Sequence, residues 1–181
     1  NVNLPMSLGT DVRYKLEGYY GDVQTNATTP DIILPLGTTN NIIFDNSNST
    51  IQERTAYWAV NQVHDQLKTV FPTYTGLDIP MQTNIDESGS CNAFFDGNSI
   101  NFYEEGGGCH ATAKIPDVVF HEYGHAINAG RYNSGSGMWN GGLNEGYADI
   151  WAFSLTESPF IGEGWDLVDP TINVRDYQDR K

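Results

Sequence analysis

The chain is short of positive charge, of cysteine and of long hydrophobic runs. Its 181 residues include 9 lysines and arginines against 23 aspartates and glutamates, which gives a formal net charge of -14. Nucleic acids and anionic membrane surfaces are bound through basic patches, so this balance disfavours both as partners. No apolar stretch approaches the roughly 18 residues that a transmembrane helix needs. Two cysteines are too few for a disulfide scaffold and allow one bridge at most.

The composition is that of a folded protein with an acidic surface. Hydrophobic residues make up 39% of the chain and charged residues 18%, at a mass of 20.0 kDa. A chain of this size can bury one hydrophobic core, so we expect one domain, or one lobe and part of another. The acidic excess favours the binding of cations, although a solvated acidic face explains the same charge equally well.

Residues 121–125 have the sequence HEYGH, which is an HExxH motif. On an α-helix, residues four apart lie on one face, so His121 and His125 can both direct a ring nitrogen at one metal ion. Glu122 is offset around the helix and can act as general base toward a metal-activated water molecule without occupying a ligand position. The motif arises by chance on the order of once in a hundred chains of this length, so a second element is needed.

That second element is the sequence LNEGYAD at residues 143–149. Catalytic zinc usually has three protein ligands and leaves the fourth position to water, and Glu145 is the obvious third ligand. Asp149 follows four residues later on the same helix face. There it can accept the remaining N–H of a ligating histidine and so fix its tautomer. Together the two motifs predict a zinc site made of His121, His125 and Glu145.

Periodicity and capping residues predict three helices. The first spans Thr55 to Phe71, the second Pro116 to Gly130 and the third Gly142 to Glu157. The glycine-rich sequence between the last two must turn the chain back. From Leu4 to Phe44, short apolar runs alternate with turn residues, which favours a twisted antiparallel sheet. His64 lies on the first helix, where we expect it to be packed or at the surface rather than a metal ligand.

Cys91 and Cys109 lie on either side of a predicted edge hairpin, residues 92–105. A disulfide between them would close the base of this hairpin, and we favour this arrangement. Two buried free thiols are an alternative. A zinc site containing Cys109 and His110 is a third, weaker one, because no further sulfur or histidine lies nearby in the sequence.

The motif pair resembles that of the thermolysin-type gluzincins, which include the fungalysin-like secreted peptidases. The sequence NAFFDG at residues 92–97 looks like the edge strand whose backbone holds an extended substrate in this family. The sequence DVV at residues 117–119, before the first histidine, also fits. The resemblance spans about residues 55–163. A metzincin is disfavoured, because its third histidine would fall on Arg131.

The resemblance implies an α+β fold with two parts. Residues 1–130 would form a strand-rich zincin N-terminal lobe that ends in the HExxH helix. Residues 131–181 would hold a loop, the helix with the glutamate ligand and the start of a truncated, helical C-terminal lobe.

The resemblance also implies substrate and calcium sites. Asn92 and Ala93 would bind the substrate backbone, and Val118 would line the pocket for an apolar residue after the scissile bond. Asp117 and Glu163 would be calcium ligands, although calcium needs more oxygen donors than these two. Zinc is therefore the expected cofactor, with calcium as a second cation.

Two residues of the family pattern are not in place. Family members stabilise the oxyanion with a tyrosine after the active-site helix and a histidine from the C-terminal lobe. No histidine follows His125 here, and the tyrosine position falls on Ser136, with Tyr132 as a displaced candidate. We therefore expect an N-terminal catalytic fragment, weak or inactive alone, whose missing partner is the C-terminal lobe of the same protein.

We predict a secreted zinc endopeptidase that hydrolyses internal bonds of peptide or protein substrates. Family members are made with a secretion signal and a propeptide, and the chain begins at Asn1 without either, as their removal would leave it. The alternative is a catalytically inactive zinc-binding or interaction module. An exopeptidase is disfavoured, because no motif for capturing a free terminus is present.

Overall fold

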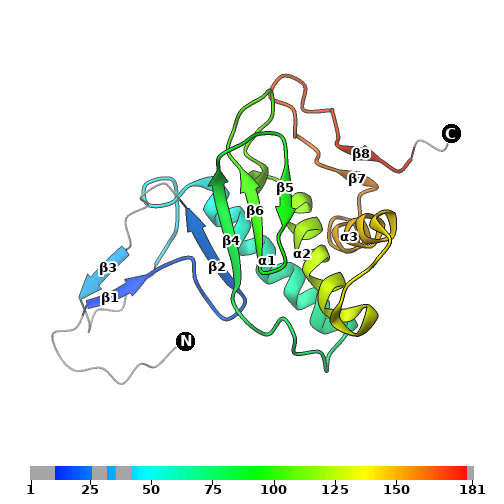
Figure 1. Ribbon diagram of the computed structural model, residues 1–181. Coiled ribbons are helices and arrows are strands. Elements are labelled where there is room, and N and C mark those ends of the chain that lie inside the picture. The colour runs from blue at the N-terminus through cyan, green and yellow to red at the C-terminus, as the bar shows by residue number, and fades with distance from the viewer. Residues whose placement is uncertain (1–10, 26–31, 36–41, 179–181) are drawn as a thin grey trace.

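The computed structural model of the chain describes residues 11–25, 32–35 and 42–178. Two helices, α1 and α2, cover one face of a four-stranded mixed sheet, and a third helix, α3, packs against them (Figure 1). This arrangement confirms the predicted α+β fold class. The described elements in chain order are β1 (Asp11–Tyr14), β2 (Gly21–Thr25), β3 (Ile32–Pro35), α1 (Ile51–Val70), β4 (Met81–Glu87), β5 (Ala93–Phe95), β6 (Ser99–Tyr103), η1 (Thr112–Lys114), α2 (Pro116–Arg131), η2 (Asn133–Gly135), α3 (Gly141–Thr156), β7 (Phe160–Ile161) and β8 (Arg175–Asp176).

The main sheet has the strand order β2-β4-β6-β5, so that β5 lies at its edge. The antiparallel pairing of β5 with β6 confirms the predicted edge hairpin. The prediction of an antiparallel N-terminal sheet holds for β1 with β3 but is wrong for β2, which pairs in parallel with β4. The connection from β2 to β4 contains the 20-residue helix α1, and a parallel pair requires a crossover of this kind. Residues 4–10, 26–31 and 36–41 of that prediction lie outside the described residues.

All three predicted helices are present. Helix α1 begins at Ile51, before its predicted start, because Thr50 and Glu53 form a capping box: the Glu53 N–H donates to the Thr50 hydroxyl, and the Thr50 N–H donates to the Glu53 carboxylate. Pro116 occupies the first turn of α2. The Asn140 side chain caps α3 by accepting a backbone N–H. Among the described residues, no helix is both long enough and apolar enough to cross a membrane.

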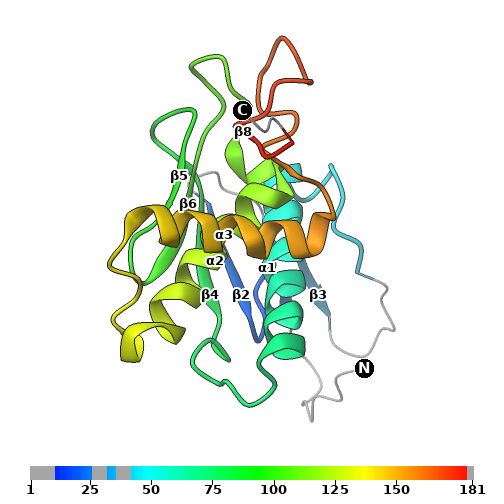
Figure 2. The same ribbon diagram turned by 90° about the vertical axis from the view of Figure 1, so that its right-hand side faces the viewer.

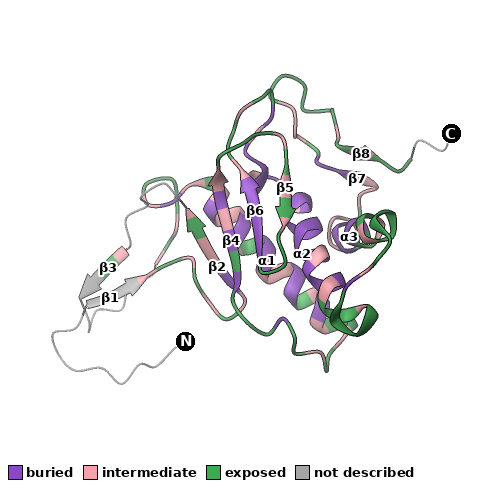
Figure 3. Cartoon of the chain, in the orientation of Figure 1, coloured by how far each residue is buried: buried purple, intermediate pink, exposed green. Residues whose placement is uncertain are grey.

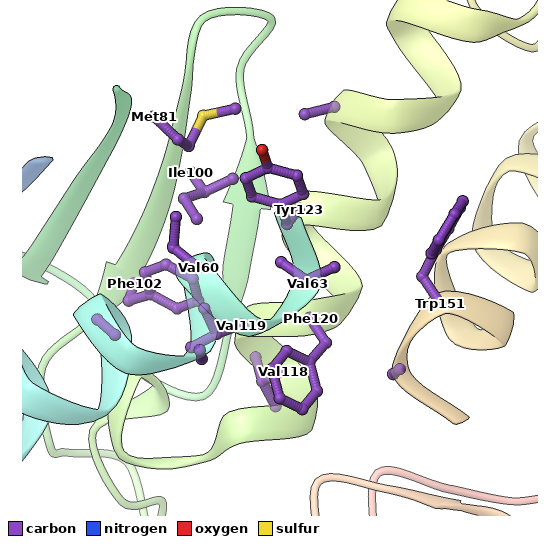
Figure 4. Close-up of a cluster of buried hydrophobic side chains, with 14 of the residues drawn as sticks. Val60, Val63, Met81, Ile100, Phe102, Val118, Val119, Phe120, Tyr123 and Trp151 are labelled. Atoms are coloured by element: carbon purple, nitrogen blue, oxygen red, sulfur yellow. The ribbon is translucent and has the colours of Figure 1, made fainter. Parts of the chain in front are cut away.

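The hydrophobic core lies where α1 and α2 meet the sheet (Figure 3). Val60 and Val63 of α1 interlock there with Phe102 of β6 and with Val119 and Tyr123 of α2 (Figure 4). All five side chains are fully buried. This packing holds the central turns of α2 rigidly against the core, and a site of defined geometry needs such a rigid element.

Cys91 and Cys109 form a disulfide with an S–S distance of 2.05 Å. The bridge lies at the base of the β5–β6 hairpin, as predicted. It excludes the two alternatives, which were a pair of free thiols and a zinc site containing Cys109. His110 instead contacts Glu105, with 3.1 Å between Nδ1 and Oε2.

His64 is packed inside the fold, as expected from its place on α1. Its ring is fully buried and stacks on Tyr20 at a centroid separation of 3.6 Å. Its Nε2 lies 3.0 Å from Asp78 Oδ1, and the Lys68 ammonium lies 2.9 Å from Asp78 Oδ2. Asp78 therefore ties the segment before β4 to two side chains of α1.

Asp78→Asn is expected to lower the thermal unfolding temperature at neutral pH. The hydrogen bonds from Lys68 and from His64 hold the pKa of Asp78 below its ordinary value, although partial burial acts in the opposite direction. A carboxylate of this kind stabilises the fold above its unfolded pKa of about 4, and the stabilisation is lost as the pH falls through the lower, folded pKa. The difference between wild type and variant should thus be full at neutral pH and shrink below about pH 4.

Circular dichroism melting curves across this pH range measure the effect. Asp65→Asn is the matched control, because Asp65 is exposed on the same helix. A difference for Asp78→Asn that stays constant down to about pH 2 would contradict the assignment.

Candidate metal centre

The site is built where α3 crosses α2 (Figure 2). Gly124 of α2 faces Ala148 of α3 so closely that a Cβ atom on Gly124 would lie 2.8 Å from the Ala148 Cα. Such a distance is too short for any side chain, so this position of the HExxH sequence must be glycine for the backbones to meet. The close crossing brings Glu145 of α3 opposite the two histidines of α2.

The three predicted ligands converge. His121 Nε2 lies 3.1 Å from His125 Nε2 and 3.2 Å from Glu145 Oε2, and His125 Nε2 lies 3.4 Å from Glu145 Oε1. Tetrahedral zinc with ligand distances of about 2.0–2.2 Å holds its ligands roughly 3.3–3.6 Å apart, so the three atoms fit one ion. Within the described part of the chain, no other group of three or more histidine, cysteine, aspartate or glutamate side chains converges in this way.

Asp149 sets the protonation of His121. This fully buried carboxylate places Oδ1 2.6 Å from His121 Nδ1, so Nδ1 carries a proton and Nε2 faces the cluster. Burial acts to lower the pKa of His121, but the hydrogen bonds to Asp149 and Glu145 and the charge of Glu122 outweigh it and raise the pKa to about 9. A metal ion that binds here must therefore displace a proton from this ring.

His125 and Glu145 complete the cluster with different exposure. Burial lowers the pKa of His125, and the charge on His121 acts in the same direction, so His125 offers a neutral nitrogen. The Glu145 side chain is half exposed. The hydrogen bond from His121 holds the pKa of Glu145 below its ordinary value, so its carboxylate is charged. Once His121 has released a proton to an incoming metal ion, two neutral nitrogens and one anionic oxygen form the donor set that catalytic zinc takes.

Glu122 lies in the same cleft but outside the group of converging atoms. Only 5% of this residue is exposed to solvent. Burial raises the pKa of Glu122 to about 7, with the charge on His121 opposing the shift and that on Glu145 adding to it. A carboxyl group that titrates near neutrality can both take up and release a proton at physiological pH.

A cleft of about 550 Å³ opens over the cluster. The three predicted substrate-binding residues all line it. Ser136 lines it too, whereas Tyr132 is not among the lining residues and packs instead on Tyr147 of α3 at a centroid distance of 5.4 Å. Of the two candidate positions for the oxyanion tyrosine, the structure therefore places Ser136, and not Tyr132, in the cleft wall. The lining residues from the predictions are Asn92, Ala93, Val118, His121, Glu122, His125 and Glu145.

Two residues near the chain end join the site without having been predicted. Arg175 of β8 places Nη2 2.7 Å from Asp149 Oδ1 and 3.2 Å from His121 Nδ1. Its Nη1 lies 3.9 Å from Glu145 Oε2. The Tyr177 hydroxyl donates a hydrogen bond to Asp149 Oδ2. No spacing rule links these residues to Asp149, which precedes them by more than two dozen positions. The one sequence signal was the rarity of cations in an acidic chain, which marks each arginine as a candidate.

These contacts determine the charge of the Asp149 carboxyl group. Burial acts to raise the pKa of Asp149, but the hydrogen bonds from His121, Tyr177 and Arg175 outweigh it, and the pKa lies below its ordinary value. Burial and the hydrogen bond to Asp149 raise the pKa of Tyr177 to about 12. Asp149 is therefore an anion that accepts hydrogen bonds, and Tyr177 keeps the proton it donates.

Asp117 and Glu163, the predicted calcium ligands, do not share a ligand cluster with a third acidic side chain in the described residues. Asp117 is buried, and its Oδ2 accepts the Gly162 N–H at 2.9 Å. Glu163 Oε2 lies 3.3 Å from the hydroxyl of Ser158. Burial raises the pKa of Asp117, against the hydrogen bonds that its carboxylate accepts from backbone N–H groups. The observed contacts tie β7 to α2, and calcium binding stays a prediction.

The fold carries a candidate metal centre made of His121, His125 and Glu145. No family model and no curated protein sequence matches the chain. Among solved structures, it is similar to the precursor of protealysin, a metalloproteinase from Serratia proteamaculans, with a TM-score of 0.60 and 18% sequence identity. The match covers 91% of this chain and 52% of that chain, so this chain spans about half the length of its structural neighbour. At this identity the similarity shows a shared fold.

Proposed function

We propose that the chain is the N-terminal part of a thermolysin-like zinc endopeptidase of the gluzincin type. The observation that carries the proposal is the convergence of His121, His125 and Glu145 on one point of a cleft, 3.1–3.4 Å apart, beside the buried carboxyl of Glu122. In this proposal, residues 1–130 are the strand-rich lobe, and residues 131–181 are the loop, the Glu145 helix and the beginning of a second lobe.

The side chains fit the hydrolysis of a peptide bond. A zinc ion at this site would polarise the substrate carbonyl and lower the pKa of a water molecule, so that the water could lose a proton and attack the carbonyl near neutral pH. Glu122 takes up the proton of the attacking water and passes it to the leaving amine. Asp149 keeps the His121 proton on Nδ1 throughout, so that Nε2 stays available.

The cleft walls fit an extended peptide. Strand β5 lies at the sheet edge, and a peptide that adds beside it would extend the sheet. Asn92 and Ala93 line the cleft on that side, and Val118 contributes an apolar wall for the residue after the scissile bond. Arg175 adds a cation to the cleft lining, where it can donate hydrogen bonds to a substrate carbonyl.

The surface of α3 supports a second lobe. A helix that is apolar on every side is normally buried. The outer side of α3 and the residues before it expose large apolar side chains, which a further lobe of the same protein would cover. These residues are Trp139, Leu143, Tyr147 and Ile150.

The disulfide supports secretion, because such bonds persist in oxidising compartments. Without an oxyanion donor from a second lobe, we expect residues 1–181 to turn over about a hundred- to a thousandfold more slowly than a complete enzyme.

Metal analysis combined with a cleavage assay tests the proposal. The chain dialysed against zinc should retain about one zinc ion per molecule. It should then cleave an internally quenched peptide with an apolar residue after the scissile bond, and a chelator should abolish the cleavage. Absence of bound zinc would disprove the proposal. Bound zinc without cleavage, even when the missing lobe is supplied as part of a longer chain, would establish the inactive zinc-binding module instead.

A further inference from the structure

Both oxygens of the buried Asp149 carboxylate are engaged, and by different partners. Oδ1 accepts hydrogen bonds from His121 and Arg175 at 2.6 and 2.7 Å. Oδ2 accepts one from the Tyr177 hydroxyl. Within the described part of the chain, Tyr177 is the one side chain that donates to Oδ2. Its hydroxyl therefore controls the half of this carboxylate that does not face His121.

The position of Tyr177 is fixed although 48% of the residue is exposed. Its ring packs edge-on against Phe153 at a centroid distance of 5.0 Å and an interplanar angle of 79°. Phe153 lies one helical turn after Asp149 on α3, so the same helix face holds the ring and the carboxylate. The Tyr177 N–H donates to the Pro159 carbonyl at 3.1 Å, next to the β7–β8 pair.

A carboxylate needs such a partner because rotation about its terminal bond is broad and roughly two-fold. If Asp149 turned about this bond, Oδ1 would move away from His121 Nδ1, and the Nδ1 proton would lose its acceptor. Arg175 does not prevent this rotation, since it binds the same oxygen as His121 and leaves Oδ2 without a donor.

We propose that Tyr177 is a positioning residue of the metal site: its hydroxyl locks the Asp149 carboxylate, which in turn holds the His121 proton on Nδ1 and directs Nε2 at the metal ion. This role rests on the proposed zinc site and extends it by one residue. Loss of a partner that supports a metal ligand weakens metal binding by about tenfold to a hundredfold, and Tyr177 acts one contact further out. The expected effect is therefore about tenfold, at the lower end of this range.

Tyr177→Phe removes the hydroxyl and keeps the ring on Phe153. Tyr147→Phe is the matched control, because it removes a hydroxyl from a half-exposed tyrosine of α3 that packs on Tyr132 and does not line the cleft. Zinc affinity is measured by competition with a chromophoric chelator. The visible absorption spectrum of the cobalt-substituted protein reports the geometry of the ligands, and the melting temperature of the metal-free protein reports stability.

Tyr177→Phe should weaken zinc binding by about tenfold and change the cobalt spectrum, while Tyr147→Phe changes neither and both melt with the wild type. An unchanged affinity and spectrum for Tyr177→Phe would overturn the proposal. So would a loss of affinity that appears only together with a matching fall in melting temperature, since Tyr177 would then serve stability alone.

A second measurement separates this proposal from the proposed function. In the metal-free protein, proton NMR edited through nitrogen-15 detects the imidazole proton on His121 Nδ1. It should exchange faster with water or move in chemical shift in Tyr177→Phe but not in Tyr147→Phe. If the wild-type chain binds no zinc, the proposed function fails. The NMR comparison still decides whether Tyr177 positions Asp149 and His121, and an unchanged signal would refute it.

Discussion

Glu122→Gln is expected to lower the rate of peptide hydrolysis by about a hundred- to ten-thousandfold and to leave the zinc content unchanged. Glutamine has nearly the same shape as glutamate but cannot accept the proton of the attacking water. Glu122 is not one of the three converging ligands, so its replacement leaves their geometry intact. Cleavage of a quenched peptide and metal analysis of the same sample measure the two quantities.

Glu104→Gln provides the control, because it makes the same chemical change at an exposed position after β6. It should have wild-type activity and zinc content. Undiminished cleavage by Glu122→Gln would refute the assigned base, and loss of zinc in this variant would show that Glu122 is needed for metal binding.

Gly124→Ala is expected to weaken zinc binding by about tenfold to a hundredfold and to destabilise the fold by roughly 1–3 kcal/mol. The new Cβ would lie 2.8 Å from the Ala148 Cα and 3.1 Å from its carbonyl oxygen. Backbone atoms cannot move aside as a flexible side chain does, so α3 must shift away from α2. Glu145 shifts with it, away from the two histidines. Zinc affinity and chemical denaturation of the metal-free protein measure the two effects.

Gly146→Ala is the matched control, because it makes the same substitution on α3, next to Glu145. No atom lies within 4 Å of the added Cβ. In an open helical position, alanine is more favourable than glycine by roughly 0.5–1 kcal/mol, so this variant should be slightly more stable and bind zinc normally. Gly124→Ala with wild-type zinc affinity would show that the spacing of the two helices does not determine the ligand geometry.

The helices and the cluster of His121, His125 and Glu145 could be predicted because they depend on residues close together in the sequence. The spacing of His121 and His125 places both rings on one helix face. The same spacing places the Glu145 and Asp149 carboxylates on one face of the next helix. The start of α1 was placed too late, since the capping box of Thr50 and Glu53 outweighs the apolar periodicity on which the prediction relied.

The pairing of strands could not be predicted in the same way. The apolar residues of β2 and the turn residues beside it do not indicate whether the neighbouring strand is parallel or antiparallel. Its pairing with β4 depends on α1 packing across the sheet, which is a contact between distant segments. The place of the Tyr132 ring could not be predicted for a related reason, because it packs on Tyr147 of α3.

The sequence by itself determined which side chains make up the candidate metal site: two imidazoles, the Glu145 and Glu122 carboxyl groups, and an aspartate behind the first histidine. These follow from helical periodicity, which is a local property of the chain. Only the tertiary structure decided how close α2 and α3 approach at Gly124, and that Arg175 and Tyr177 return to Asp149. Contacts of that kind depend on the path of the intervening chain, for which a single sequence carries no spacing rule.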